Sequence, residues 1–132
     1  MNARPGFGMD DAPAGTGPGA VADALRALIA DGDDRLPLPG SGRTLERWRR
    51  LAAVAERDLA LAKLYEGHTD ALAIQQELGC GPARAGAWGT WCAEPPQARL
   101  HMRPQSDGRL RLSGRKAWCS GAALLDHALV SG

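Results

Sequence analysis

The sequence has no long hydrophobic run and is poor in cysteine, aromatic residues and net charge. No apolar stretch approaches the roughly 20 residues that a membrane-spanning helix needs. The N-terminus carries Gly, Pro and Ala around Asp10 and Asp11, where a secretory signal would have a hydrophobic core. These absences predict a cytoplasmic chain with no membrane partner.

The cysteine pattern excludes a disulfide framework. Cys80, Cys92 and Cys119 have no C-x-x-C spacing, and an odd number leaves one thiol unpaired under any pairing scheme. This favours a reducing compartment with buried thiols. The His and Cys residues also lack the spacing of a zinc site, so no metal ligands are predicted.

The near-zero charge gives no electrostatic case for a nucleic-acid partner, because 16 basic residues face 15 acidic ones. Arg43, Arg47, Arg49 and Arg50 do cluster. Glu46 stands four residues before Arg50 and can pair with it on a helix. We therefore interpret the cluster as a solvated helix face, with a phosphate site as the alternative.

Motifs for hydrolytic or nucleotide chemistry are missing. No Ser, His and Asp arrangement has nucleophile-elbow spacing. Gly15, Gly17 and Gly19 are interrupted by Pro18 and follow no strand, which excludes a phosphate loop.

The histidines offer no catalytic site of their own. His68 is interpreted as a packing or capping residue rather than a ligand, and His101 is expected to face solvent. His127 follows Asp126, so the two side chains can orient each other. No catalytic residue is named.

The pattern predicts an α+β fold, with a flexible tail over residues 1–19, a helical domain over 20–82 and a partial β-domain over 83–132. One helix begins near Val21 and ends at Asp31-Gly32. A second begins at Thr44, carries a stripe of apolar residues and extends toward Tyr65. Gly67 is expected to break it, and Thr69 to cap a third helix that ends at Gly79. The stripe consists of Leu45, Trp48, Ala52, Ala55 and Leu59.

The remaining sequence predicts antiparallel strands. Residues 88–93 are short and aromatic, and residues 100–112 alternate apolar and polar around a turn at Ser106-Asp107-Gly108. Further strands are expected over 116–120 and 127–130. Trp118 with Cys119 and Ser120 stands out, because a lone indole beside small residues suits a planar ligand. The alternative is a core Trp buried on one face of a sheet.

Residues 58–132 resemble the acyl-CoA dehydrogenase family in three segments that occur in the right order. The first is Asp58-Leu59-Ala60-Leu61-Ala62, followed by His68, Ala71 and Leu72. The second, Trp91-Cys92-Ala93-Glu94-Pro95, is similar to the Thr-Glu-Pro motif that opens the family's middle β-domain. The third, residues 112–121, is similar to the family's strand of Gly, Lys, Trp and a hydroxyl residue. Ala93 stands where the family has Thr, and residues 96–99 replace its usual Gly, Ser and Asp.

The resemblance implies an acyl-CoA dehydrogenase-like fold, with FAD as cofactor and an acyl-CoA-type substrate. Trp118 would pack on the flavin ring and Ser120 would offer its hydroxyl to the ring edge. The full set of implied cofactor-binding residues is Thr90, Cys92, Ala93, Trp118, Cys119 and Ser120. The family's catalytic carboxylate belongs to a C-terminal bundle that this chain lacks. The chain is therefore expected to be a truncated fragment, inactive alone and homo-oligomeric only when completed.

The alternative hypothesis is a non-catalytic interaction or scaffold domain. Its helical half would dock a partner, and the exposed strand at 127–130 would pair with another chain.

Overall fold

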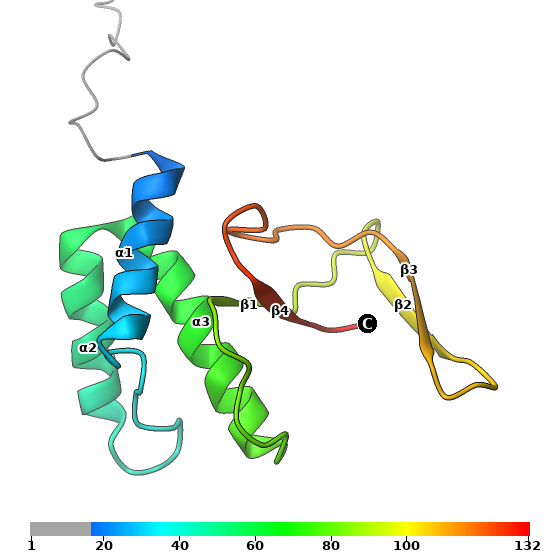
Figure 1. The fold of residues 1–132 in the computed structure, drawn as a ribbon, viewed down its shortest axis with the longest axis horizontal. Helices are drawn as coiled ribbons and strands as arrows, with labels where there is room; N and C mark the ends of the chain where they lie inside the picture. Colours follow the sequence, from blue (N-terminus) through cyan, green and yellow to red (C-terminus); the bar gives the residue numbers. More distant parts are fainter. Residues whose placement is uncertain (1–16) are drawn as a thin grey trace, which may run out of the picture.

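The described part of the chain, residues 17–132 of a computed structural model, has a mixed α+β fold in which helices precede strands (Figure 1). This confirms the predicted fold class and order. The helices are α1 (Pro18–Ala30), α2 (Thr44–Arg57) and α3 (Leu59–Glu77). The strands are β1 (Trp88–Trp91), β2 (Leu100–Pro104), β3 (Leu110–Gly114) and β4 (His127–Val130). None of these helices combines the length and hydrophobicity needed to cross a bilayer.

The predicted flexible tail extends too far toward the C-terminus, and most of it cannot be compared with the structure. Residues 1–16 lie outside the described residues, whereas Pro18 and Gly19 already belong to α1. Gly17 is the N-cap of that helix, and Pro18 occupies its first turn, where proline is tolerated because the N–H has no helical acceptor.

The hydrophobic core lies where α1 and α2 pack against α3. Tyr65 is 1% exposed, and its hydroxyl donates to the carbonyl of Asp33 at 2.6 Å, which fixes the loop after α1. Burial raises the pKa of Tyr65 above its ordinary value. The buried core residues are Leu25, Leu28, Val54, Leu61, Leu64, Tyr65 and Ala87.

The boundary between the second and third helices differs from the prediction. The break occurs at Asp58, whose backbone is extended and whose side chain accepts a hydrogen bond from Leu61 N at 2.8 Å. Asp58 is therefore an N-cap. Gly67 lies inside α3 instead of ending it, and Thr69 bonds back to the carbonyl of Glu66 rather than capping a new helix.

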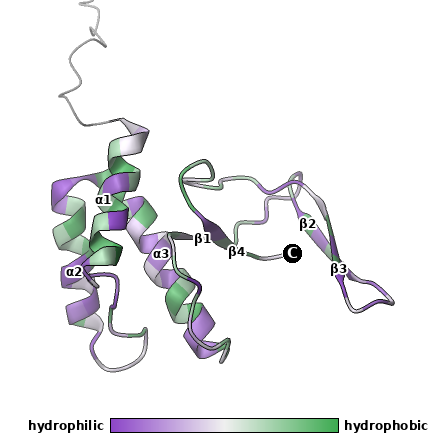
Figure 2. Ribbon diagram, viewed as in Figure 1, coloured by the Kyte–Doolittle hydropathy of each residue, from purple (hydrophilic) through white to green (hydrophobic). Residues whose placement is uncertain are grey.

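The apolar stripe faces outward; its first four residues lie on α2, and Leu59 begins α3. Leu45 is 58% exposed and Trp48 is 63% exposed, while Arg47 and Val54 on the other side of the helix are buried. Figure 2 shows hydrophobic and hydrophilic segments alternating along α2, at the edge of the helical part away from the sheets. The opposite face packs on α3 because it carries Val54 and the ion-paired Arg47.

The arginine cluster is not a uniformly solvated face. Arg47 donates to the Asp70 carboxylate at 2.7 Å with its side chain only 8% exposed. Arg50 pairs with Asp33 at 3.2 Å, so the expected pairing of Glu46 with Arg50 is wrong. Glu46 instead accepts two hydrogen bonds from the Arg43 guanidinium.

The strands form two separate pairs, of which only one is antiparallel. β2 and β3 make the predicted hairpin, with Leu100 opposite Gly114. β1 and β4 are parallel, in a register that sets Trp88 opposite His127. The expectation of an antiparallel β-domain is therefore wrong for this pair. The predicted strand over 116–120 is also wrong, because residues 115–119 have no regular structure and a turn follows.

The remaining predictions concern the exposure of cysteines and histidines, and some are confirmed while others are wrong. Cys80 and Cys92 are exposed and Cys119 is half-buried, so the expected burial of the thiols is wrong. His101 is exposed and His68 is buried within the helix–sheet contact, as predicted.

Candidate functional site

A pocket of about 240 Å³ lies where α3, β1 and the turn after Trp118 meet. We call it the Trp118 pocket. Residues from three separate segments line it, and they include all but one of the residues that the sequence resemblance nominated. Those lining residues are Thr90, Cys92, Ala93, Trp118 and Ser120. The exception is Cys119, whose Sγ lies 3.6 Å from the carbonyl of Lys116 instead.

Trp118 is not a core residue. Its side chain is 73% exposed, which excludes the alternative of an indole buried against the sheet. Its backbone has φ of 56°, in the left-handed region that bulky residues rarely adopt. Such conformations cost about 1–3 kcal/mol and are concentrated at functional sites. Trp118 thus combines an exposed apolar ring, a strained backbone and a position on the pocket. Neither core packing nor turn geometry explains this combination, which makes Trp118 the leading candidate for a ligand contact.

Two glycines keep the pocket floor flat. A Cβ added at Gly89 would lie 2.9 Å from the Trp91 Nε1 atom and 3.0 Å from Leu125 Cδ1. A Cβ at Gly67 would reach 3.6 Å from the backbone N of Thr90, so α3 and β1 approach closely. The Thr90 hydroxyl donates to the Gly67 carbonyl at 2.8 Å across this contact. That hydroxyl therefore anchors β1 to α3.

Polar contacts hold two of the lining segments together. The Trp91 indole N–H donates to the Ser120 carbonyl at 3.1 Å and attaches the turn to β1. Lys116 is nearly buried and donates to both oxygens of Ser131 at 2.9 Å. The Ser131 hydroxyl in turn bonds the carbonyl of Cys92. The neighbouring Ser131 hydroxyl and Lys116 ammonium lower the pKa of Glu94 below its ordinary value.

The pocket is equipped for binding rather than proton transfer. Its lining contains no Asp, Glu or His, and its titratable groups are Lys63 and Cys92. The Lys63 ammonium pairs with Glu66 at 2.9 Å. Among residues 17–132, no three His, Cys, Asp or Glu side chains gather closely enough to hold a metal ion. The pocket lining thus offers one cation, the Lys63 ammonium, and no carboxylate or imidazole that could act as a general base.

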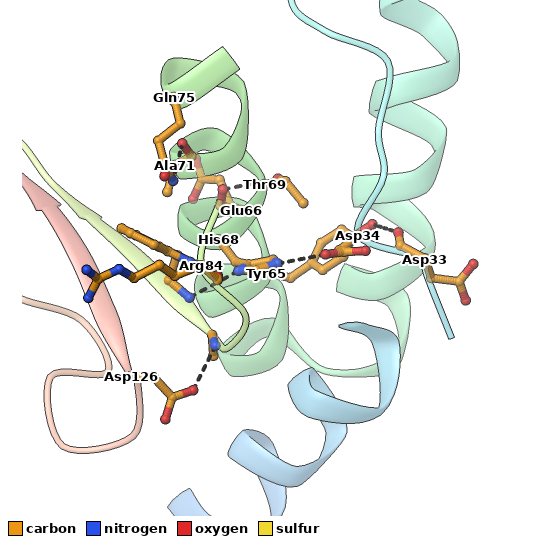
Figure 3. Close-up of polar contacts among 12 residues, drawn as sticks. Asp33, Asp34, Tyr65, Glu66, His68, Thr69, Ala71, Gln75, Arg84 and Asp126 are labelled. Carbon is orange, nitrogen blue, oxygen red and sulfur yellow. Dashed lines mark hydrogen bonds and ion pairs between the residues drawn. The ribbon is translucent and has the colours of Figure 1, made fainter. Parts of the chain in front are cut away.

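His68 fixes the strand that carries half of the pocket. Its Nδ1 accepts the backbone N–H of Trp88 at 3.1 Å, and its Nε2 lies 3.1 Å from the carboxylate of Asp34 (Figure 3). An imidazole that accepts at Nδ1 must carry its proton at Nε2, which donates to Asp34. One side chain therefore joins the loop after α1, the middle of α3 and the start of β1.

Asp126 attaches β4 to the same end of the sheet. Its carboxylate accepts the N–H of Ala87 at 2.8 Å (Figure 3) and pairs with Arg26 of α1 at 3.3 Å. The Ala87 amide, followed by the Arg26 charge, lowers the pKa of Asp126 below its ordinary value. His127 instead bonds the Ala85 carbonyl and stacks on Trp88, with ring centroids 4.6 Å apart. The predicted orientation of His127 by Asp126 is therefore wrong.

We expect Asp126→Asn to reduce stability more at pH 6 than at pH 3. A carboxyl whose folded pKa is lowered stabilises the fold above its unfolded pKa of about 4, and this contribution is lost as the pH falls through the folded value. Urea unfolding at both pH values measures the difference. Asp23→Asn, at an exposed position of α1, is the control. Equal losses at the two pH values would contradict the role of the charge.

Sequence reasoning missed the helical side of the pocket. Lys63 and Leu64 of α3 and Leu125 of the turn line it without any motif of their own. Gly67 gave no signal of this contact, because a Cβ there would lie at an ordinary distance of 3.6 Å from the Thr90 N atom, and the residue was interpreted as a helix end.

Comparison of the chain with profiles of known families, with curated proteins and with solved structures finds no match.

Proposed function

We propose that the Trp118 pocket is one wall of a flavin site, and that the chain is part of an acyl-CoA dehydrogenase-like oxidoreductase acting on acyl thioesters. The observation that carries this proposal is the meeting of residues 90–93 and 118–120. These segments were selected by their resemblance to flavin-contacting motifs, and they line a single pocket although a hairpin separates them in sequence.

The shape and chemistry of the wall suit an isoalloxazine ring. The ring is planar with apolar faces and hydrogen-bonding edges, so it needs an aromatic surface and short polar groups beside it. Trp118 supplies an exposed indole, Ser120 contributes its backbone and hydroxyl, and Gly67 and Gly89 leave the floor free of side chains. A flavin bound here would supply the acceptor for a hydride from the β-carbon of the substrate.

The same wall explains why residues 17–132 are not expected to catalyse the reaction. Removal of the α-proton requires a base, and the lining has no carboxylate or imidazole. We therefore expect this 132-residue chain to bind FAD poorly and to show no acyl-CoA dehydrogenase turnover.

The test is a titration of the ¹⁵N-labelled chain with lumiflavin, which is the ring system without its ribityl and adenine groups. We expect amide shifts confined to residues 63–67, 89–93 and 118–120, together with the Trp118 indole N–H, and a dissociation constant of about 1 mM. Trp118→Ala should weaken binding about three- to tenfold, because a stacked aromatic pair contributes about 0.5–1.5 kcal/mol.

Trp48→Ala is the matched control, because Trp48 is an exposed indole of similar accessibility on α2, outside the pocket. ADP, the other part of FAD, should leave the pocket amides unshifted. Absence of shifts at millimolar lumiflavin, or equal binding by the Trp118→Ala protein, would contradict the flavin wall.

A second candidate function, strand pairing with another protein, has one observation in its favour. Within residues 17–132, β4 pairs only with β1, so its other edge carries backbone groups with no strand beside them. An unpaired edge is a template for an added strand. If added partner peptides shift β4 amides while lumiflavin shifts none, this function replaces the first.

A further inference from the structure

The outward face of α2 has the sequence pattern of a coiled-coil seam. Leu45, Trp48, Ala52 and Ala55 alternate at spacings of three and four residues, which are a and d positions within α2, and Leu59, the first residue of α3, borders the same surface beyond the break at Asp58. We call this set the α2 stripe. Most of its members are exposed, and none is part of the buried core. Large exposed apolar residues in a continuous row mark an interaction surface rather than isolated surface residues.

The stripe carries both a protrusion and a recess that can receive it. Trp48 is 63% exposed and stands in the N-terminal half of α2. Toward the other end of the stripe, Ala52, Ala55 and Leu59 border a groove between α2 and α3 that also contains Ala62. The small alanines let a neighbouring helix approach closely. A surface with a knob at one end and a hole at the other can pair with a second copy of itself turned end for end.

The charges beside the stripe also favour an antiparallel pair of α2 helices. Arg49 and Glu56 both occupy the e position of the heptad, and both are exposed. In an antiparallel pair of helices, e positions face e positions. When Ala52 is set opposite Ala55 of the second copy, Arg49 lies beside Glu56, twice by symmetry. Trp48 then lies over the C-terminal end of the other α2, where Ala55 and Leu59 border the groove. A parallel pair would align e with g positions instead, and would set Trp48 against Trp48.

We propose that the α2 stripe docks against the α2 stripe of a second copy of this chain. The two helices run antiparallel about a two-fold axis between Ala53 and Val54. Trp48 of each copy fills the groove beside Leu59 of the other, and Arg49 pairs with Glu56 across the seam. A helix of this length spans about 21 Å, so the interface is smaller than a standard one and the dimer is transient.

Sedimentation velocity of the full chain from 5 to 500 µM tests the proposal. We expect a monomer–dimer equilibrium with a dissociation constant of about 10–100 µM. Trp48→Ala should raise this constant about tenfold or more, because a buried tryptophan anchor dominates a small interface. Trp118→Ala is the matched control and should leave it unchanged, because Trp118 lines the Trp118 pocket, to which no α2 residue contributes. Trp118→Ala should weaken lumiflavin binding without affecting the dimer, and Trp48→Ala should weaken the dimer without affecting lumiflavin binding. The two proposals can therefore fail independently.

A charge-swap cycle tests the register. Arg49→Glu and Glu56→Arg each place like charges opposite one another and should each weaken the dimer about threefold to tenfold. The double variant restores the opposite-charge pairs and should return the dissociation constant to that of the unaltered chain. Circular dichroism confirms that each variant keeps its helix content.

The outcomes separate the possible occupants of this face. A chain that stays monomeric at 500 µM overturns the proposal and leaves the α2 stripe to a different protein. A dimer that is unaffected by Trp48→Ala also overturns it, since the contact then lies elsewhere, for example at β4. A dimer that loses affinity with Trp48→Ala but does not recover in the double charge swap overturns the antiparallel register.

Discussion

Replacing His68 with leucine should lower the free energy of unfolding by about 3 kcal/mol. Leucine fills a similar space, so the expected loss is mainly polar. The Trp88 N–H would lose its acceptor inside the helix–sheet contact, and the Asp34 carboxylate, whose side chain is only 12% exposed, would lose its donor. An unsatisfied buried group costs about 1–3 kcal/mol, and more when it is charged. Urea unfolding measures the change as a lower midpoint with an unchanged slope.

His68→Asn is the matched variant for this result. The asparagine carbonyl oxygen occupies a position close to that of Nδ1 and can accept from Trp88, while the contact with Asp34 is lost. We expect it to recover part of the stability that leucine loses. If His68→Leu and His68→Asn unfold at the same urea concentration, the hydrogen bond to β1 does not contribute as we infer.

The second large effect is expected at Gly121. Its φ is 73°, and a Cβ there would lie 2.6 Å from Leu64 Cδ2 and 3.1 Å from Leu125 Cδ1. Gly121→Ala therefore combines a left-handed alanine, at about 1–2 kcal/mol, with overpacking of about 1–3 kcal/mol. Either the Leu64 side chain, which also lines the pocket, or the turn that carries Trp118 and Ser120 must shift to relieve the contact. Lumiflavin shifts at the pocket should weaken together with the stability.

Gly40→Ala separates the two causes. Gly40 has almost the same φ, 76°, but a Cβ there meets nothing within 4 Å. We expect it to cost only the backbone component and to leave the pocket unchanged. Equal destabilisation by the two substitutions, measured by urea unfolding, would show that contact with Leu64 is not important.

The sequence predicted element types better than element partners. Hydrophobic spacing identified the helices, and turn residues identified the β2–β3 hairpin, because both depend on neighbours along the chain. The break at Asp58 was missed because a capping aspartate competes with a continuous apolar pattern. The exposure of the α2 stripe was missed for another reason: a pattern reveals which face is apolar but not which surface covers it.

For the pocket, too, local features were predictable from the sequence and long-range contacts were not. Local motifs selected Thr90, Cys92, Ala93, Trp118 and Ser120, and the structure brings these residues together. Cys119 does not line the pocket although it lies between Trp118 and Ser120 in the sequence. The left-handed backbone at Trp118 prevents the extended strand that was expected there. The contribution of α3 depended on a long-range contact through Gly67, which no local pattern specifies.

The parallel pairing of β1 with β4 has a consequence for the order of folding. These strands meet only after residues 92–126 have been closed into a loop, whereas the helices and the hairpin are built from near neighbours. Closing a long loop costs entropy before any contact compensates for it, so such pairings form late and open early. We therefore expect the two sides of the Trp118 pocket to come together late in folding and to separate early in partial unfolding.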